Sequence, residues 1–208
     1  GSEMCIRDRY TTVPLGIIFS DNMILTISFI KNDVIQAFAD GKLKGLSTVS
    51  RSRFLLQIFS GSARVYLEYL KQIDKQTSLV EKKLQRSMRN KELVEFLNIE
   101  KSLVFFATSL KANELVLDRL QRTGMLQMQV DDADLLEDVI IENRQAIEMT
   151  NIHSNILSAL MDAFASIISN NLNVVMKFLT SVTIILMFPV WISSVYGMNI
   201  KLPFQDSP

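Results

Sequence analysis

Apolar residues recur every three or four positions over most of this chain, which predicts long helices. One such pattern starts at Arg51, and a second runs from Leu93 to Leu120. The polar run 87–91 is the best place for a turn between them, so the economical interpretation of residues 51–130 is an antiparallel helical hairpin. Gly61 and its neighbour Ser62 are a candidate irregularity in the first helix.

The first part of the chain has a different pattern. Two apolar, β-rich runs, Val13–Phe19 and Met23–Ile30, flank a Ser-Asp-Asn turn and predict a β-hairpin. Val34–Ala39 predicts a short helix, and residues 41–50 a connection. Because two strands alone are marginally stable, we interpret residues 11–50 as the remnant of a larger α/β domain. The expected fold class is therefore α+β, mostly α.

A third helical pattern begins at Asp131-Asp132, which is a candidate N-cap, and acidic residues in the first turns match the helix dipole. A coiled-coil-like spacing of apolar residues follows and predicts packing against neighbouring helices, so residues 131–177 form an expected stalk helix. His153 lies on the stripe that these apolar residues form. Without a second histidine, it is more simply a packed or hydrogen-bonded residue than a metal ligand.

The same helical pattern continues into an apolar segment. Residues 178–196 form a run of about 19 residues without a charge, close to the ~20 needed to cross a bilayer. Continuous from Asp131 to Tyr196, such a helix would be about 95–100 Å long, too long for a compact domain. We expect residues 178–197 to span a membrane and the preceding ~170 residues to lie on one side of it.

Steps of three or four residues along this helix follow one stripe, whose part inside the expected membrane span carries small, hydroxylic or thioether side chains. Its members are Asp162, Ala165, Ser169, Asn173, Met176, Thr180, Thr183, Met187, Val190 and Ser194. Periodicity alone favours a helix–helix contact, since small residues let membrane helices approach closely. The alternative is a water-filled pore lined by the stripe in an oligomer.

Composition limits the classes of function that remain for this chain. The 22 basic and 22 acidic residues balance, which argues against a nucleic-acid partner. One cysteine and one histidine exclude a Cys- or His-based metal cluster within one chain. No glycine-rich phosphate loop, nucleophile–base pair or paired-carboxylate motif indicates an enzyme.

Tyr196-Gly197-Met198-Asn199 directly follows the apolar segment, and this position makes the tripeptide specific. It resembles the corresponding motif of the CorA family of divalent-cation channels. The run Leu15–Thr26 resembles the strand pair of that family's cytosolic domain. Leu136–Val139, followed by Glu142-Asn143, resembles the start of its stalk helix. The resemblance covers about residues 13–199.

The resemblance implies a homopentamer in the cell membrane, with a cytoplasmic N-terminal part and a central pore built from the first transmembrane helices. Residues 198–208 would begin the extracytoplasmic loop. Gly197, Met198 and Asn199 would form the selectivity motif, with Asn199 as a ring of amide oxygens that binds hydrated Mg²⁺. Asp162 and Asp138 would bind a regulatory Mg²⁺. The pore lining implied by the stripe and the resemblance consists of Asn173, Met176, Leu179, Thr180, Thr183, Met187, Val190 and Ser194.

The sequence also departs from the family. It ends at Pro208, before a second transmembrane helix, and Lys201 precedes Asp206 where the family's loop often carries acidic residues. We therefore interpret the chain as a fragment that does not conduct by itself. Two alternatives stay open: a Zn²⁺, Co²⁺ or Ni²⁺ transporter on the same scaffold, and a single-span, membrane-anchored coiled-coil scaffold that moves no ions.

Overall fold

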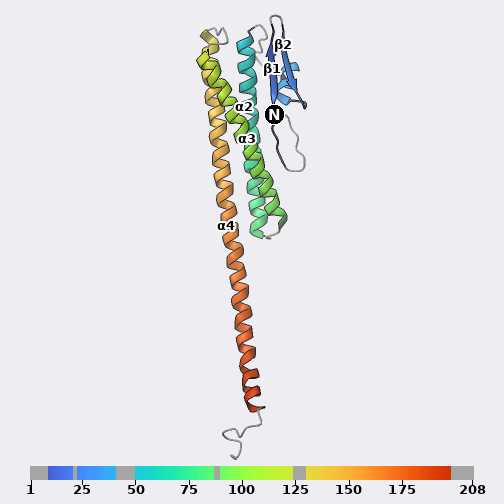
Figure 1. The fold of residues 1–208 in the computed structure, drawn as a ribbon, viewed down its shortest axis with the longest axis vertical. Helices are drawn as coiled ribbons and strands as arrows, with labels where there is room; N and C mark the ends of the chain where they lie inside the picture. The colour runs from blue at the N-terminus through green and yellow to red at the C-terminus, as the bar shows by residue number, and fades with distance from the viewer. Residues whose placement is uncertain (1–8, 21–22, 41–49, 87–89, 124–129, 198–208) are drawn as a thin grey trace, which may run out of the picture. The chain divides into compact units, whose positions relative to one another are not determined.

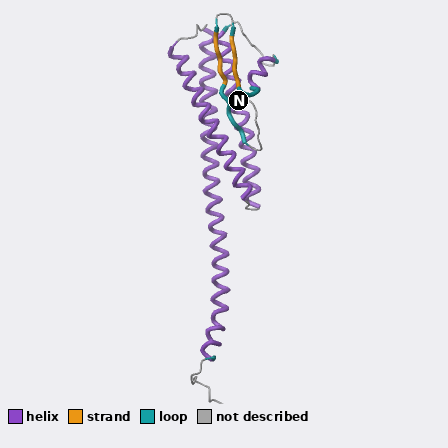
Figure 2. The backbone as a smooth tube through the Cα atoms, turned by 45° about the vertical axis from the view of Figure 1, so that its right-hand side comes forward, coloured by secondary structure: helices purple, strands orange, loops and turns teal. Residues whose placement is uncertain are grey.

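The computed structural model describes residues 9–20, 23–40, 50–86, 90–123 and 130–197 (Figure 1). The chain divides into two compact units, residues 1–160 and 161–208. The first unit holds two strands, three helices and the first part of a fourth helix, α4 (Val130–Tyr196). The remainder of α4 forms the described part of the second unit. Figure 2 shows how strongly helix predominates in the described chain.

Helices α2 (Arg51–Arg86) and α3 (Asn90–Thr123) form the predicted helical hairpin. Lys83 near the end of α2 lies 3.3 Å from Glu95 near the start of α3. Further along, the rings of Tyr66 and Phe106 meet edge to face at 5.1 Å. Because residue numbers rise in one helix as they fall in the other, the two helices are antiparallel.

The candidate irregularity at Gly61 is wrong, because α2 is a continuous helix through Gly61 and Ser62. Tertiary packing explains this glycine. A Cβ atom at Gly61 would lie 3.1 Å from Cγ1 of Val34 in helix α1 (Asp33–Ala39). That distance is tighter than an ordinary van der Waals contact, so the glycine lets α1 lie close against α2.

Strands β1 (Leu15–Phe19) and β2 (Ile24–Ser28) form the predicted antiparallel hairpin, with Leu15 opposite Ser28 and Phe19 opposite Ile24. Its inner face packs on α1 and α2, where Val34, Phe38, Phe54 and Ile58 are buried. Asn32 caps α1, since its Oδ1 accepts hydrogen bonds from the backbone N–H groups of Val34 and Ile35. The Asp21-Asn22 turn lies outside the described residues.

The expected N-cap at Asp131-Asp132 is also wrong, because α4 already begins at Val130. Asp132 is instead 1% exposed and accepts hydrogen bonds from the hydroxyls of Ser52 (3.0 Å) and Ser50 (3.3 Å). These serines lie at the start of α2, about 80 positions earlier. The carboxylate therefore connects two elements rather than capping one.

In the first unit α4 packs against both helices of the hairpin. Leu136, Val139 and Ile140 form a buried cluster with Leu56 of α2 and Leu117 of α3. Further along α4, the His153 side chain is only 12% exposed and its Nδ1 lies 3.8 Å from Asp74 of α2. His153 is therefore packed between helices, as its position in the apolar stripe predicts.

Candidate ion pathway

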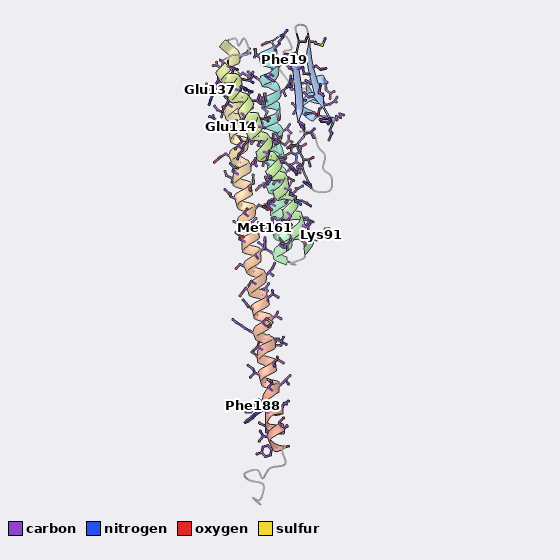
Figure 3. All side chains as sticks on the ribbon, in the orientation of Figure 1. Phe19, Lys91, Glu114, Glu137, Met161 and Phe188 are labelled. Carbon is purple, nitrogen blue, oxygen red and sulfur yellow. The ribbon has the colours of Figure 1, made fainter. Side chains whose placement is uncertain are left out.

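The described part of the second unit is helical from Met161 to Tyr196, and this segment carries the proposed pathway. Of the described residues, only α4 contains a stretch long and apolar enough to cross a membrane, and none of that stretch is buried. Its large side chains, such as Phe178, Ile185 and Phe188, are exposed. Phe188 is labelled in Figure 3. A helix satisfies its own backbone hydrogen bonds, so such a surface suits lipid or neighbouring helices.

Every residue of the predicted pore lining lies on α4 and is exposed in this chain. The set is Asn173, Met176, Leu179, Thr180, Thr183, Met187, Val190 and Ser194. The helix continues through Pro189, which lacks the N–H that would otherwise bond to the Ile185 carbonyl. The stripe is therefore one continuous strip of helix surface.

The threonine hydroxyl groups of this segment are oriented by their own helix. Thr180 donates to the Met176 carbonyl and Thr183 to the Leu179 carbonyl, both at 2.8 Å. Once the hydrogen is used in this way, the oxygen presents only lone pairs to a neighbour. A strip of such oxygens can accept hydrogen bonds from water bound to a cation. The stripe pattern did not reveal this orientation, although back-bonding of Ser and Thr within helices is a general signal for it.

The end of α4 is defined by a hydrogen bond at Gly197. Its backbone N–H donates to the Ser193 carbonyl at 2.9 Å, and the helix ends at Tyr196. A Cβ atom at Gly197 would lie 3.2 Å from that same carbonyl oxygen, so a larger residue would crowd the helix end. Met198 and Asn199, the rest of the motif, lie outside the described residues.

Asp138 and Asp162, the candidate regulatory acids, are both exposed. They belong to different units, Asp138 to the first and Asp162 to the second. Over the described ranges of the chain, no group of three or more His, Cys, Asp or Glu side chains is placed to hold a metal ion. Either carboxylate supplies the hard oxygen ligand that Mg²⁺ prefers, and further ligands would have to come from water or another subunit.

Residues 7–208 match the family model described as "CorA-like Mg2+ transporter protein". The chain belongs to this family. It is a family of transporters and not of enzymes. The helical hairpin, the two-stranded sheet and the long C-terminal helix are thus a CorA-type fold, as the resemblance implied.

Named relatives agree with the family assignment. The chain is 31% identical to a cobalt/magnesium transport protein CorA of Methanocaldococcus jannaschii, over 97% of this chain and 65% of that protein. It is 26% identical to a magnesium transport protein CorA of Helicobacter pylori, over 94% of this chain and 62% of that protein. The chain therefore spans less than two thirds of the length of these relatives.

Solved structures show the same architecture. The complete structure of the CorA magnesium transporter from M. jannaschii matches 98% of this chain and 70% of its own, with a TM-score of 0.75 and 26% identity. The soluble domain of CorA from the same organism matches 71% of this chain and 61% of its own, with a TM-score of 0.65.

Proposed function

We propose that this chain contributes the pore helix and part of the cytoplasmic domain of a pentameric channel that carries Mg²⁺ across the cell membrane. One observation carries the proposal. The charge-free segment 178–196 has no buried residue in this chain and ends immediately before Gly197-Met198-Asn199. The names of the relatives, which refer to magnesium or cobalt/magnesium transport, support the choice of ion.

In this proposal Asn199 selects the ion. Mg²⁺ gives up its water molecules reluctantly, so a ring that binds the hydrated ion avoids a large energetic cost. Five Asn199 amide oxygens, together with the Gly197 carbonyls, accept hydrogen bonds from those waters. Neutral amides hold the ion weakly enough for it to move on, as conduction requires.

Below this ring, the hydrated ion passes along the stripe. Asn173, Thr180, Thr183 and Ser194 supply polar rings, and the threonine oxygens are already oriented as acceptors. Met176, Leu179, Met187 and Val190 supply apolar rings. Narrow apolar rings exclude water, so they close the pathway when the helices approach one another.

Regulation in this proposal comes from Mg²⁺ inside the cell. Ions bound at Asp162 and Asp138, with acids of a neighbouring subunit, hold the stalks together and the pore closed. When the ion leaves, like charges repel and the closed state loses its advantage, because a ligand stabilises the state that it binds more tightly.

The proposed division of the chain follows from these roles. Residues 11–50 and 51–130 belong to the cytoplasmic domain, 131–177 form the stalk, 178–197 cross the membrane and 198–208 begin the outer loop. Of the described residues, no charged side chain lies between Lys177 and Gly197, which supports the limits of the crossing.

Mg²⁺ flux into proteoliposomes tests the proposal, with the full-length native protein and an internal Mg²⁺ dye. Asn199→Ala should reduce flux at least tenfold, because the selecting amides are lost. Asn170→Ala is the matched control: Asn170 is an exposed asparagine of the same helix, away from the stripe, and its variant should retain flux. Native mass spectrometry should detect five copies. Full flux in Asn199→Ala would refute the role of the motif.

Co²⁺ is the second candidate cargo, because the M. jannaschii relative is named a cobalt/magnesium transport protein. Dedicated Zn²⁺ or Ni²⁺ transport has less support, since those ions favour nitrogen or sulfur ligands and the only histidine is packed near Asp74. Competition by each ion during Mg²⁺ uptake separates these cargoes. The coiled-coil scaffold alternative predicts no flux at all.

A further inference from the structure

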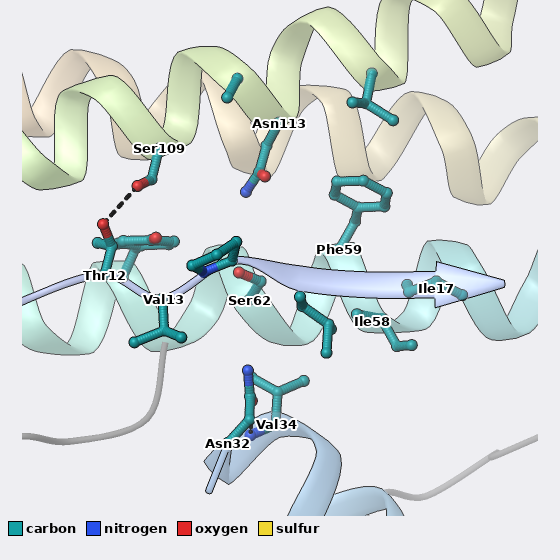
Figure 4. Close-up of a pocket in the computed structure, with 15 residues that line it drawn as sticks. Thr12, Val13, Ile17, Asn32, Val34, Ile58, Phe59, Ser62, Ser109 and Asn113 are labelled. Atoms are coloured by element: carbon teal, nitrogen blue, oxygen red, sulfur yellow. Dashed lines mark hydrogen bonds between the residues drawn. The ribbon is translucent and has the colours of Figure 1, made fainter. Parts of the chain in front are cut away.

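The first unit contains a cavity of about 330 Å³ that the proposed ion pathway does not use (Figure 4). The segment 12–17 crosses the groove between α2 and α3, and Val34 of α1 closes another side. The lining of α3 comes from residues about 100 positions after the crossing segment. Only the tertiary fold brings these surfaces together.

The lining of this cavity carries no charged side chain. Ile17, Ile58, Phe59 and Val116 provide much of its apolar surface. An ion that entered would lose hydration without gaining a counter-charge, which is costly. The cavity is therefore suited to a neutral molecule.

The polar groups in the lining fall into two sets, those with a hydrogen-bond partner and those without, and Asn32 belongs to the first because its Oδ1 caps α1. Thr12 and Ser109 belong to the first set as well, since the Ser109 hydroxyl donates to Thr12 at 2.8 Å, and Ser109 is also a polar neighbour of the Tyr66 hydroxyl. Asn113 of α3 and Ser62 of α2 point into the cavity, and neither side chain has a hydrogen-bond partner among the described residues.

The second set defines what a ligand must offer. A carboxamide such as that of Asn113 has two N–H donors and a carbonyl acceptor. A ligand amide can pair with both kinds of group at once, and the Ser62 hydroxyl can take part as donor or acceptor. A ring attached to that amide would occupy the apolar surface near Ile58 and Phe59.

We propose that this cavity binds a neutral small molecule consisting of one apolar ring and an amide, with the amide on Asn113 and Ser62. The volume is at the small end of the range for ligand sites, which suits a single ring. Bound ligand joins segment 12–17, α2 and α3, so it stabilises the first unit by mass action. This inference is independent of ion transport.

Benzamide is the probe, and saturation-transfer NMR on the full-length protein in detergent measures its binding. Benzoate has the same shape with a charge, and toluene has the ring without the amide. Saturable benzamide binding, with benzoate and toluene each at least tenfold weaker, would support the proposal. This comparison needs no variant.

Two variants locate the site. Asn113→Leu and Ser62→Leu should each weaken benzamide binding at least tenfold, the second also by filling space. Asn151→Leu changes an exposed asparagine of α4, outside the cavity lining, and should bind as the unmodified protein does. Circular dichroism checks that each variant is folded.

Three results would overturn the proposal. The first is that benzamide shows no saturable binding, whether or not another part of the chain blocks the cavity. The second is that benzoate or toluene binds as tightly as benzamide. The third is that folded Asn113→Leu binds benzamide with unchanged affinity. Transport activity enters none of these readouts, so failure here leaves the proposed function untouched.

Discussion

The carboxamide of Asn143 in α4 donates a 3.1 Å hydrogen bond to the backbone carbonyl of Leu110 in α3. Both residues are buried, and they are 33 positions apart. The preceding residue of α4, Glu142, accepts a 2.7 Å hydrogen bond from Ser60 of α2. Two adjacent residues of α4 thus hold it to both helices of the hairpin.

Asn143→Ala should lower the free energy of unfolding of the first unit by about 1 kcal/mol, the usual net contribution of one hydrogen bond. Urea denaturation followed by circular dichroism measures the change. The control is Asn151→Ala, which alters an exposed asparagine two turns further along α4. Equal stability of the two variants would mean that the Asn143 contact contributes nothing.

Asp132→Ala should lower the free energy of unfolding by about 1–3 kcal/mol, because the buried Ser52 hydroxyl and the partly buried Ser50 hydroxyl lose their acceptor. Asp134 lies in the same turn but is exposed, so Asp134→Ala should stay within about 0.5 kcal/mol of the unmodified protein. The same urea titration compares them. If Asp134→Ala were the more damaging change, Asp132 would not be the structural carboxylate.

Because of Tyr66, the free energy of unfolding of the first unit should decrease at high pH. Burial raises the pKa of the Tyr66 hydroxyl above its ordinary value of 10.0, and the hydrogen bond with Ser109 offsets part of that rise. The folded protein then keeps a proton that the unfolded chain releases. The associated stability is fully present below pH 10 and is lost as the pH rises through the raised folded pKa.

Urea midpoints between pH 7 and 11 test this dependence. From pH 7 to 9 the urea midpoints of the unmodified protein and of Tyr66→Phe should differ by a constant amount. This range is the internal control. Above pH 10 the stability of Tyr66→Phe should decline less steeply with pH than that of the unmodified protein. Parallel curves over the whole range would show that Tyr66 does not couple ionisation to folding.

Thr183→Val should reduce Mg²⁺ flux severalfold if the stripe lines the pathway. Valine keeps the shape of threonine but removes the oxygen that accepts hydrogen bonds from hydrated cations. Ser181→Ala is a matched control, since Ser181 also donates to its own helix, at 2.9 Å to the Lys177 carbonyl, but points away from the stripe. Larger loss of flux in Ser181→Ala would indicate that a different face of α4 meets the ions.

Asp162→Ala should make channel opening less sensitive to internal Mg²⁺, because a proposed ligand of the closed state is removed. Patch-clamp currents of the full-length protein at a series of internal Mg²⁺ concentrations measure the shift. Asp138→Ala should act in the same direction. Asp134→Ala, an exposed acid near Asp138, serves as the control, and unchanged sensitivity in Asp162→Ala would exclude that residue as a sensor.

Much of the fold follows from local pattern. The hairpin, α1, the two helices of the helical hairpin and the apolar end of α4 are predictable because periodicity of 2 or 3.6 reflects one buried face per element. The candidate pore residues are likewise predictable as a stripe. The role of these residues cannot be predicted in this way, because the spacing does not show which neighbours the stripe faces.

The errors have a different origin. Asp131-Asp132 has the composition of an N-cap, yet Asp132 is buried because Ser50 and Ser52 lie where its carboxylate can reach them. Gly61 has the composition of a break, yet α2 continues through it, and the glycine instead leaves room for Val34 of α1. In both cases a partner distant in sequence outweighed a weak local preference.

By itself the sequence determined where helices and strands form, that residues 178–196 have the length and apolarity of a membrane span, and that Gly-Met-Asn follows that span. Each of these properties depends on neighbours within a few residues. Only the tertiary structure decided that Asp132 joins α4 to α2, that Asn143 joins α4 to α3, and that segment 12–17 encloses a cavity with α3. These contacts depend on residues tens of positions apart, whose meeting is set by packing of the whole unit.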